Sequence, residues 1–176
     1  MKITFRKFKD NETEYVKIYN WCKNDFVFAW FEQRILSFEE IKEKYKNKHK
    51  EKKQELLIIQ CNSKDIGLVQ IYKYKKDINI NYLNNFNNIY EFDLFIGEKE
   101  YLSRGIGTKV VNLINKKING NYNADAIILR PFNKNIRAIK CYQKCNYKII
   151  TEYEGKDTLN NSELISVLLN TKNTDD

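Results

Sequence analysis

A glycine-containing turn at residues 104–108 has the composition of a phosphate-binding site. It leads into a segment whose apolar residues recur at helical spacing. The first amides of a helix have no partner inside the helix, and the helix dipole favours an anion at that end. Gly105 and Gly107 carry no Cβ, so a diphosphate could approach the backbone, and Arg104 adds a charged contact. The same pattern also occurs as simple turn chemistry without a ligand.

Two other phosphate-binding arrangements fit this turn less well. A Walker loop is excluded, because no Gly-Lys-Ser/Thr follows the glycines. A dinucleotide-binding fold is disfavoured, because the turn lies past the middle of the chain and after strands that are expected to be antiparallel.

Two carboxylates are expected on one side of a strand at residues 90–96. Successive side chains of a strand point to opposite faces, so residues two apart share a face. On this pattern Glu91, Asp93 and Phe95 face one way, and the other face carries Tyr90, Phe92, Leu94 and Ile96.

A helix expected at residues 135–144 contributes the most specific pattern, which is Asn135, Ala138 and Tyr142 in the spacing Asn-x-x-Ala-x-x-x-Tyr. Together with the turn at residues 104–108, it resembles the GNAT superfamily of acetyl-CoA-dependent N-acetyltransferases. In that superfamily a pyrophosphate loop and this helix occur in the same order and at the same separation. The chain is most similar to bacterial aminoglycoside 6'-N-acetyltransferases, through residues 92–98, 105–108 and 135–142.

The resemblance implies an α+β fold in αβα layers. Its centre would be a mostly antiparallel mixed sheet of about seven strands, flanked by about four helices and splayed at the acyl-CoA site. We expect one acetyltransferase domain at residues 1–170 and a frayed tail at residues 171–176.

Acetyl-CoA is the acyl donor that the resemblance implies. In the family, backbone groups of the splayed strands bind the pantetheine arm and the thioester carbonyl, and here they would belong to Phe95 and Ile96. The other residues expected to bind the donor are Arg104, Gly105, Ile106, Gly107, Thr108, Asn135 and Ala138.

Two side chains match the catalytic positions of the family. An ammonium group cannot attack the thioester, so a carboxylate must accept its proton directly or through water. Asp93 matches the family's acidic residue and is expected to be that base, or only an electrostatic anchor for the amine, with Glu91 in support. Tyr142 matches the tyrosine that protonates the leaving thiolate; the alternative is a buried aromatic residue of the helix.

The acceptor is expected to bind near the aromatic segment at residues 26–31, where Trp30 and Phe31 form either a wall of the cleft or ordinary core. One residue argues against an aminoglycoside. Where the 6'-N-acetyltransferases have an acidic residue before a proline, this chain has Arg130 before Pro131. With a net charge of +8, a positive residue there would repel a polycation.

Three functions are therefore compared. The first is an aminoglycoside 6'-N-acetyltransferase, or a relative that acts on another small-molecule amine. The second is an acyltransferase for a hydroxylamine or lysine-type amine in siderophore biosynthesis. The third is a non-catalytic module that binds CoA or nucleic acid. Nucleic acid is disfavoured, because the aromatic residues follow core periodicity and do not interleave with a basic groove.

Composition sets the broad class. Hydrophobic residues make up 42% of the chain, which is enough for a folded core, and no apolar run approaches the length of a membrane span. We therefore expect a cytoplasmic protein, monomeric or homodimeric, without a membrane segment. The scattered cysteines and the single histidine suggest neither a metal site nor a disulfide framework. Cys141 and Cys145 are expected to be small buried residues on one helix face rather than a redox pair.

These residues must be positioned by elements that the sequence predicts as follows. A first strand contains Ile3 and Phe5. Helices are expected from Asp10 or Asn11 to Cys22, from Ser37 with its capping box, and from Ile106 until the Asn-Gly-Asn at residues 119–121. A hairpin at residues 55–61 and 66–74 is joined by a connection at residues 62–65, and a loop covers residues 75–89. The remaining strands are expected at residues 124–129, 147–153 and 163–169, and Asn146 is expected to close the last helix in a left-handed conformation.

Overall fold

The computed structural model describes residues 1–31, 33–51, 54–157 and 159–171. Within these ranges, seven strands form one sheet in the order β1-β2-β3-β4-β5-β7-β6. Their bounds are β1 (Ile3–Lys7), β2 (Gln54–Cys61), β3 (Lys64–Lys73), β4 (Ile89–Ile96), β5 (Ala126–Leu129), β6 (Lys148–Lys156) and β7 (Ser162–Thr171). Neighbouring strands are antiparallel except for β4 and β5, which are parallel. The predicted mostly antiparallel mixed sheet is confirmed.

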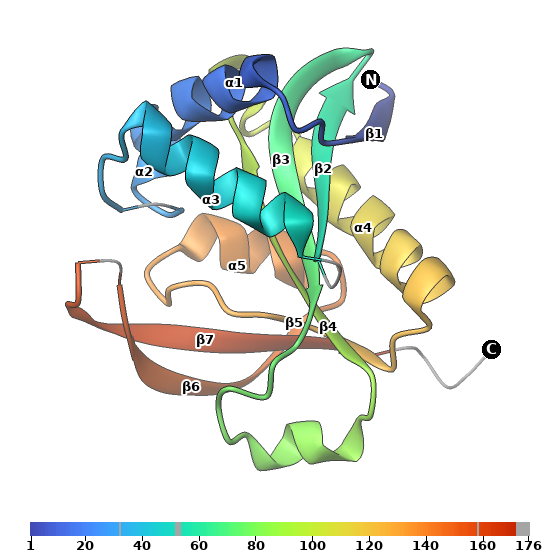
Figure 1. The fold of residues 1–176 in the computed structure, drawn as a ribbon. Coiled ribbons are helices and arrows are strands. Elements are labelled where there is room, and N and C mark those ends of the chain that lie inside the picture. Colours follow the sequence, from blue (N-terminus) through green and yellow to red (C-terminus); the bar gives the residue numbers. More distant parts are fainter. Residues whose placement is uncertain (32, 52–53, 158, 172–176) are drawn as a thin grey trace.

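Helices cover both faces of this sheet (Figure 1). One face carries α1 (Glu12–Cys22), α2 (Asp25–Phe28) and α3 (Phe38–Lys50), and the other carries α4 (Ile106–Tyr122) and α5 (Ile136–Gln143). The described residues thus contain one α-helix more than the expected four, and the extra one, α2, is a single turn. Two short 3-10 helices also occur, at Asn81–Asn85 and Lys99–Tyr101. No helix in the described part of the chain combines the length and apolarity needed to cross a bilayer.

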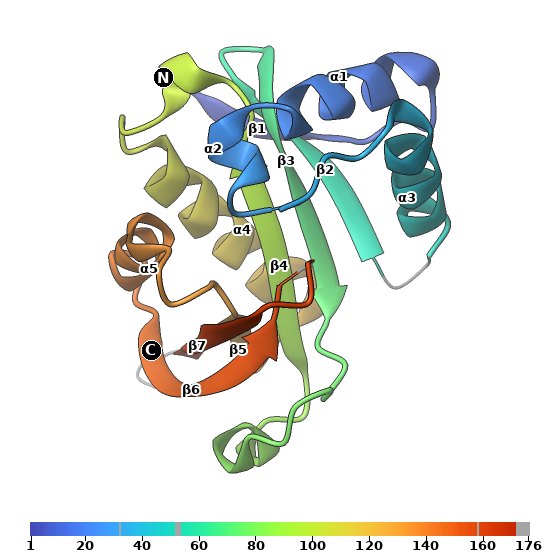
Figure 2. The ribbon, with the colours of Figure 1, turned by 90° about the vertical axis from the view of Figure 1, so that its left-hand side faces the viewer.

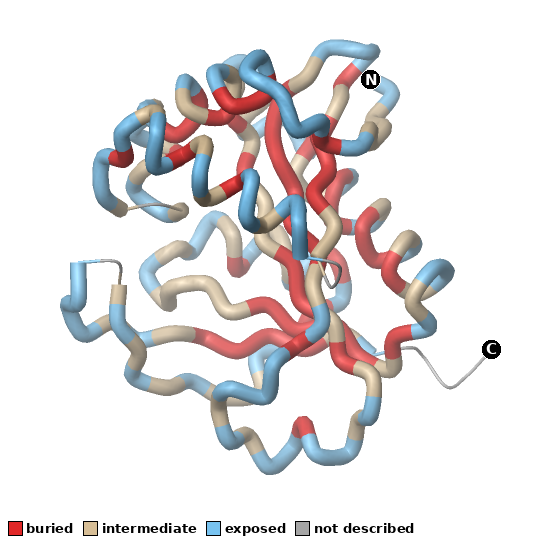
Figure 3. The backbone as a smooth tube through the Cα atoms, in the orientation of Figure 1, coloured by how far each residue is buried: buried red, intermediate tan, exposed pale blue. Residues whose placement is uncertain are grey.

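The core lies on both faces of the central strands. On β2, Leu56 and Ile58 pack toward α1 and α3, and the alternating Leu57 and Ile59 pack toward α4. Figure 3 shows this burial as red concentrated along the central strands, with the outer sides of the helices exposed. Since strand side chains alternate, an unbroken apolar run such as that of β2 is typical of a strand covered on both faces.

The sheet splays between β4 and β5. Strand β4 pairs with β3 from Tyr90 to Ile96, but with β5 only from Ile89 to Glu91. Figures 1 and 2 show the consequence, because β5, β7 and β6 turn across the direction of β2, β3 and β4. The edge of β4 that faces β5 is therefore unpaired beyond Glu91, and its backbone groups need other partners. This is the splay that the sequence predicts.

The helix caps were predicted from local sequence. The Asn11 side chain accepts a hydrogen bond from the Glu14 amide at 3.0 Å and caps α1. Ser37 and Glu40 exchange the two hydrogen bonds of a capping box at the start of α3. Asn146 has a φ of 66°, so the predicted left-handed residue after α5 is confirmed.

Two element boundaries differ from the prediction. Helix α4 continues through the Asn-Gly-Asn sequence and ends at Tyr122, where Asn123 adopts the left-handed conformation. The extra turn is held by Tyr122, whose ring stacks on Tyr90 at 4.8 Å between centroids and whose hydroxyl bonds to Glu55. At the other end of the chain β7 continues to Thr171, which pairs with Ala126, and the rest of the expected tail lies outside the described residues.

The β2–β3 hairpin is also tighter than expected. Cys61 pairs directly with Lys64, so only Asn62 and Ser63 form the turn. Both have positive φ, at 48° and 69°. Two central residues with positive φ match the twist of the strands that such a turn connects.

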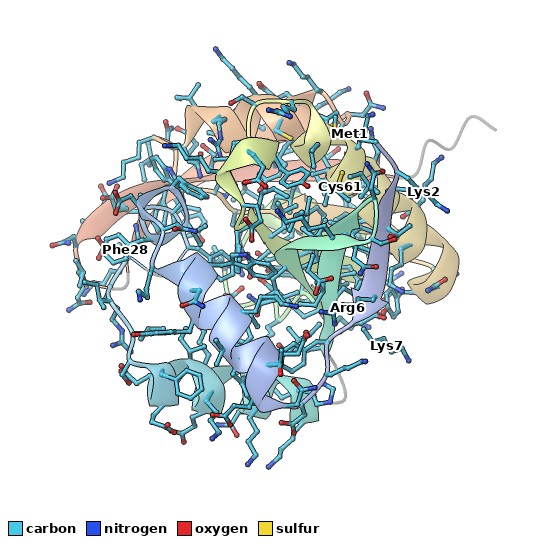
Figure 4. All side chains as sticks on the ribbon, turned by 90° about the horizontal axis from the view of Figure 1, so that it is seen from above. Met1, Lys2, Arg6, Lys7, Phe28 and Cys61 are labelled. Atoms are coloured by element: carbon cyan, nitrogen blue, oxygen red, sulfur yellow. The ribbon has the colours of Figure 1, made fainter. Side chains whose placement is uncertain are left out.

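A partly buried ionic cluster joins β1, α1 and β3 at one corner of the fold. The Arg6 guanidinium bonds to Glu14 at 2.7 Å and also to Asp65, and Lys17 approaches the same two carboxylates. Figure 4 looks down on this corner and shows Arg6 on β1 beside α1. The cluster is structural and lies apart from the cavity described next.

Candidate active site

A cavity of about 650 Å³ lies where β4 and β5 separate. It is bounded on one side by the α2 region and α3, and on the other by the starts of α4 and α5. The residues that line it include Phe26, Val27, Trp30, Phe31, Lys44, Lys48, Asp93, Leu94, Phe95, Ile96, Gly105, Gly107, Thr108, Arg130, Asn135, Arg137, Ala138, Lys140, Cys141, Tyr142 and Lys144. Most of the residues predicted for the site, from four separate segments, therefore share one cavity.

The start of α4 has the backbone that an anion-binding turn requires. Gly105 is the N-cap residue with a φ of 71°, and no side chain caps the helix. Ser103 also has a positive φ, at 58°. The amides of the first helical turn are thus left without a capping acceptor. The two side chains that flank Gly105 lie differently: Arg104 is exposed outside the cavity lining, and Ile106 is buried in the core at the start of α4. The buried Ile106 side chain cannot reach a ligand, whereas the exposed Arg104 side chain remains accessible beside the turn.

Gly107 has a second reason to lack a side chain. A Cβ at this position would approach the Cys141 Sγ to 3.3 Å. The Thr108 hydroxyl lies 3.6 Å from the same sulfur, and the Cys145 thiol contacts the Thr108 carbonyl. Both cysteines are free thiols, so they pack α5 against α4 as small residues. Burial raises the pKa of the Cys141 thiol, which keeps it protonated at neutral pH.

Helix α5 brings three positive charges to the cavity that were missed in the sequence. They are Arg137, Lys140 and Lys144, which lie on one helical face because they are three and four residues apart. The spacing was visible in the sequence and could have been used. The helix begins at Asn135, whose side chain accepts a hydrogen bond from the Ala138 amide at 3.2 Å. Asn135 therefore caps α5 and lines the cavity at the same time.

Asp93 is half-buried in the cavity wall. Its Oδ2 accepts a hydrogen bond from the Tyr72 hydroxyl at 2.8 Å. Tyr72 comes from β3, two residues after Gln70, which is the direct cross-strand partner of Asp93. The contact orients the carboxylate and leaves Oδ1 without a protein donor among the described hydrogen bonds. Burial is the largest of the effects that raise the pKa of Tyr72, so its hydroxyl keeps its proton and remains a donor at neutral pH.

Tyr142 lines the same cavity from α5. Its ring packs near Tyr147, with 6.0 Å between the centroids. Burial raises the pKa of Tyr142 above its usual range, and the Asp93 carboxylate acts in the same direction. The phenol is therefore protonated at neutral pH and can donate a proton but not accept one.

Family membership follows from the sequence match to a known domain. A family model described as an acetyltransferase (GNAT) domain matches residues 10–154. The chain belongs to the GNAT acetyltransferase family. The matched region runs from before α1 into β6, so it contains β4, the turn at residues 104–108, α4 and α5.

Solved structures of GNAT enzymes share the fold. The aminoglycoside acetyltransferase AAC(6')-Ib, in complex with coenzyme A and kanamycin, has a TM-score of 0.79 at 17% identity, over 97% of this chain and 95% of that one. The spermidine N-acetyltransferase of Vibrio cholerae, with CoA and spermine, has a TM-score of 0.76 at 18% identity, over 97% and 95%. A GNAT acetyltransferase from Streptococcus pneumoniae has a TM-score of 0.67 at 16% identity, over 97% and 99%. At these identities the likeness establishes the fold alone.

Glu91 is more deeply buried than Asp93 in this GNAT chain. It is only 3% exposed, and both of its carboxylate oxygens accept hydrogen bonds from Arg130, at 2.7 and 2.8 Å. Arg130 also bonds both oxygens of Asp77, at 3.1 and 3.0 Å. The expectation that Glu91 would help to bind the amine is corrected, because Arg130 already occupies its carboxylate. The expected repulsion from Arg130 is also reduced, because two carboxylates surround its charge.

The aromatic segment belongs to both the core and the cavity, so the two interpretations of it are compatible. Phe31 packs edge-on against Phe95 at 4.7 Å between centroids, and Trp21 contacts the other side of Phe95 at 6.1 Å. Trp30 is 38% exposed and lines the cavity together with Phe31. In this wall Phe31 is therefore packed against the core, and Trp30 is accessible from solvent.

Breaking the cluster of Arg130, Glu91 and Asp77 should make the loss of stability depend on pH. Replacing Arg130 with methionine should lower the free energy of unfolding by roughly 2 kcal/mol at pH 8, because Glu91 stays buried without its donors. Burial raises the pKa of Glu91 to about 7 against the opposing effect of Arg130, so loss of Arg130 should raise it further. A carboxyl group with a raised pKa in the folded state binds its proton more readily there, so stability is lost as the pH rises. The deficit should therefore shrink from pH 8 to pH 6 in urea unfolding.

A double variant supplies the control for this experiment. With Glu91→Gln added to Arg130→Met, the titrating group is gone and the deficit should no longer change between the two pH values. A deficit of equal size at pH 6 and pH 8 in the single variant would contradict the assignment.

Proposed function

We propose that this GNAT protein transfers an acetyl group from acetyl-CoA to the primary amine of a small molecule. The observation that carries the proposal is that Asp93 and Tyr142 line one cavity, which also reaches the uncapped start of α4. A proton acceptor, a proton donor and an anion-binding helix end are the groups that this transfer needs.

The donor side of the cavity fits a CoA thioester. The diphosphate would lie against the amides of residues 105–108, with the positive face of α5 near its remaining phosphate charge. The pantetheine arm would lie along the unpaired edge of β4, where the backbone of Phe95 and Ile96 lacks a partner on β5. Asn135 and Ala138 border the same path.

The chemistry then follows from the two side chains. The amine nitrogen attacks the thioester carbonyl carbon, and its proton passes to Asp93 directly or through water. The carbon–sulfur bond breaks and the acetyl group remains on nitrogen as an amide. The departing thiolate takes its proton from the Tyr142 hydroxyl. Trp30 and Phe31 would contact the acceptor on the side opposite to the motif helices.

Aminoglycosides are the first acceptors to test, in keeping with the sequence resemblance. The fold shared with AAC(6')-Ib supports this choice, as does the pairing of Arg130 with Glu91 and Asp77. Polyamines are the second class, because a spermidine acetyltransferase shares the fold. The cytoplasmic location and the monomeric or homodimeric state remain predictions.

Acetyl-CoA should raise the melting temperature. A ligand at 100 times its Kd stabilises the folded state by about 2.7 kcal/mol. For a domain of this size that corresponds to an increase in Tm of roughly 5 to 10 °C. The double variant Arg137→Ala, Lys140→Ala should reduce this increase in Tm. The control is Lys46→Ala with Lys50→Ala, which removes two exposed positive charges from α3 and should leave the increase unchanged. Release of free thiol with kanamycin, tobramycin and spermidine then tests the acceptor. No melting shift at saturating acetyl-CoA would contradict the proposed donor.

A further inference from the structure

The segment that links β4 to the start of α4 is held against α1 at Gly97. The indole ring of Trp21 lies directly over this glycine, because a Cβ on Gly97 would come within 2.2 Å of the Trp21 Cγ. That distance is far inside van der Waals contact, so any side chain at position 97 would displace the indole. Trp21 is only 4% exposed and Gly97 is buried, so the contact lies inside the fold.

Hydrogen bonds hold the same segment from three directions. The Trp21 Nε1–H donates to Glu98 Oε1 at 2.9 Å. The Asn24 side-chain amide donates to the Gly97 carbonyl at 2.9 Å, and the Gly97 amide donates to the Ile66 carbonyl at 2.7 Å. Residues 97 and 98 are thus bound to α1, to the residue before α2 and to β3.

The side chain of Asn24 makes this contact instead of capping a helix. Asn24 is the N-cap residue of α2, and an asparagine there usually accepts a hydrogen bond from a helical amide. Its side chain makes no capping bond in the described structure and is turned to the Gly97 carbonyl. Neither Trp21 nor Asn24 is among the described residues that line the cavity. Any effect of these two residues on a ligand therefore passes through the segment that they hold.

This segment joins the two stretches of backbone that the proposed function assigns to the donor. Before it lies the unpaired edge of β4 at Phe95 and Ile96, and after it lies the uncapped turn at residues 105–108. Trp21 also packs edge-on against Phe95, with 6.1 Å between the centroids. A shift of residues 97–98 would therefore change the spacing between the backbone that faces the thioester and the amides that face the diphosphate.

We infer that Trp21, Asn24 and Glu98 are positioning residues for the CoA donor and that they act through the backbone at residue 97. Together they hold the end of β4 at the distance from the start of α4 that one CoA molecule spans. The inference rests on the proposed function, which assigns the donor, and it adds three residues that are not among the described lining of the cavity.

Calorimetric titration with CoA tests this inference without any acceptor amine. Trp21→Phe keeps an aromatic ring over Gly97 but has no N–H for Glu98, so the Kd for CoA should rise by about fivefold or more. Asn24→Ala leaves the indole in place and should raise the Kd by a similar factor. Glu98→Ala should match Trp21→Phe, and Glu98→Gln, which keeps an acceptor oxygen, should recover most of the loss.

Tyr15→Phe is the matched control. Tyr15 is a buried aromatic residue of the same helix, α1, and its hydroxyl donates to Asp10 away from the cavity. This variant should lower Tm while the Kd for CoA is unchanged. It therefore separates a loss of stability from a loss of position.

A combined variant shows whether the residues act as one unit. Trp21→Phe with Glu98→Ala should bind CoA no worse than either single variant, because both substitutions remove the same hydrogen bond. An unchanged Kd in both Trp21→Phe and Asn24→Ala would overturn the inference, and would leave the proposed donor in place. If the wild-type protein bound no CoA, the proposed function would fail together with the inference.

Discussion

Replacing Asp93 with asparagine is expected to lower kcat/KM for amine acetylation by about 100- to 10,000-fold. The asparagine keeps the shape of the side chain but can neither accept the proton of an ammonium group nor attract its charge. The carboxylate is half-buried in the cavity wall and is held there by the Tyr72 hydroxyl at 2.8 Å. A water molecule in its place would be a much weaker proton acceptor. Initial rates of thiol release over a range of amine concentrations measure the loss.

The division of the loss between kcat and KM separates the two roles open to Asp93. A general base acts in the transition state, so its removal lowers kcat and kcat/KM together. An electrostatic anchor binds the ground state as well, so its removal raises KM with a smaller change in kcat. Tyr72→Phe, which removes only the orienting hydrogen bond, should have a smaller effect than Asp93→Asn. Full turnover of Asp93→Asn with an unchanged KM would exclude both roles.

Replacing Tyr142 with phenylalanine is expected to lower kcat by about 100-fold or more. The ring and its packing are kept, and only the hydroxyl that would protonate the departing thiolate is lost. Burial raises the pKa of Tyr142, so the wild-type phenol carries its proton over the whole neutral range. The rate of the variant should therefore be low at every pH from 6 to 9, and it should not be restored by a change of pH. Steady-state rates at saturating amine and acetyl-CoA provide the measurement.

Tyr147 supplies the matched control. Its ring lies 6.0 Å from that of Tyr142, and its hydroxyl donates to Asn115 Oδ1 at 2.7 Å in the buried core. Tyr147→Phe removes a hydroxyl of the same kind from the same region, but outside the cavity. It should lower stability by about 1 kcal/mol while kcat is retained. If Tyr142→Phe also retained kcat, Tyr142 would be a buried aromatic residue of the helix and not the proton donor.

The Arg130 cluster reduces the positive charge that an acceptor meets at the active site. A net charge of +8 and an arginine beside the cleft argue against any polycationic acceptor. Two carboxylates surround that arginine, and one of them, Asp77, comes from the loop after β3. Arg130 thus holds the loop to the end of β5. The charge of Arg130 is therefore largely neutralised before an acceptor reaches the cavity, and Asp93 remains as the nearby carboxylate that is not bound to Arg130.

Patterns confined to one element were predictable. The alternation of β4 placed Asp93 and Phe95 on one face, and the caps at Asn11, Ser37 and Asn135 were evident from residue type and spacing. The end of α4 was not predictable, because Tyr122, two residues after Gly120, contacts Tyr90 and Glu55, and these contacts outweigh the tendency of Gly120 to end the helix. Local propensities amount to fractions of a kcal/mol to about 1 kcal/mol, so contacts with other elements override them.

The sequence by itself determined the glycine turn and the helix at residues 135–144, because each depends on residues close together in the chain, and the order of these motifs indicated the family and its layered fold. Only the tertiary structure decided which side chains remain available to a ligand. Glu91 and Asp93 are equivalent by spacing, yet Glu91 is bound to Arg130, 39 residues away, and Asp93 lies beyond the last β4–β5 pair. Likewise Arg130, Asp77 and Glu91 meet only because the loop after β3, strand β4 and the end of β5 converge. Charge and hydrogen bonding act through space, so the partners of a side chain depend on the folded chain as a whole.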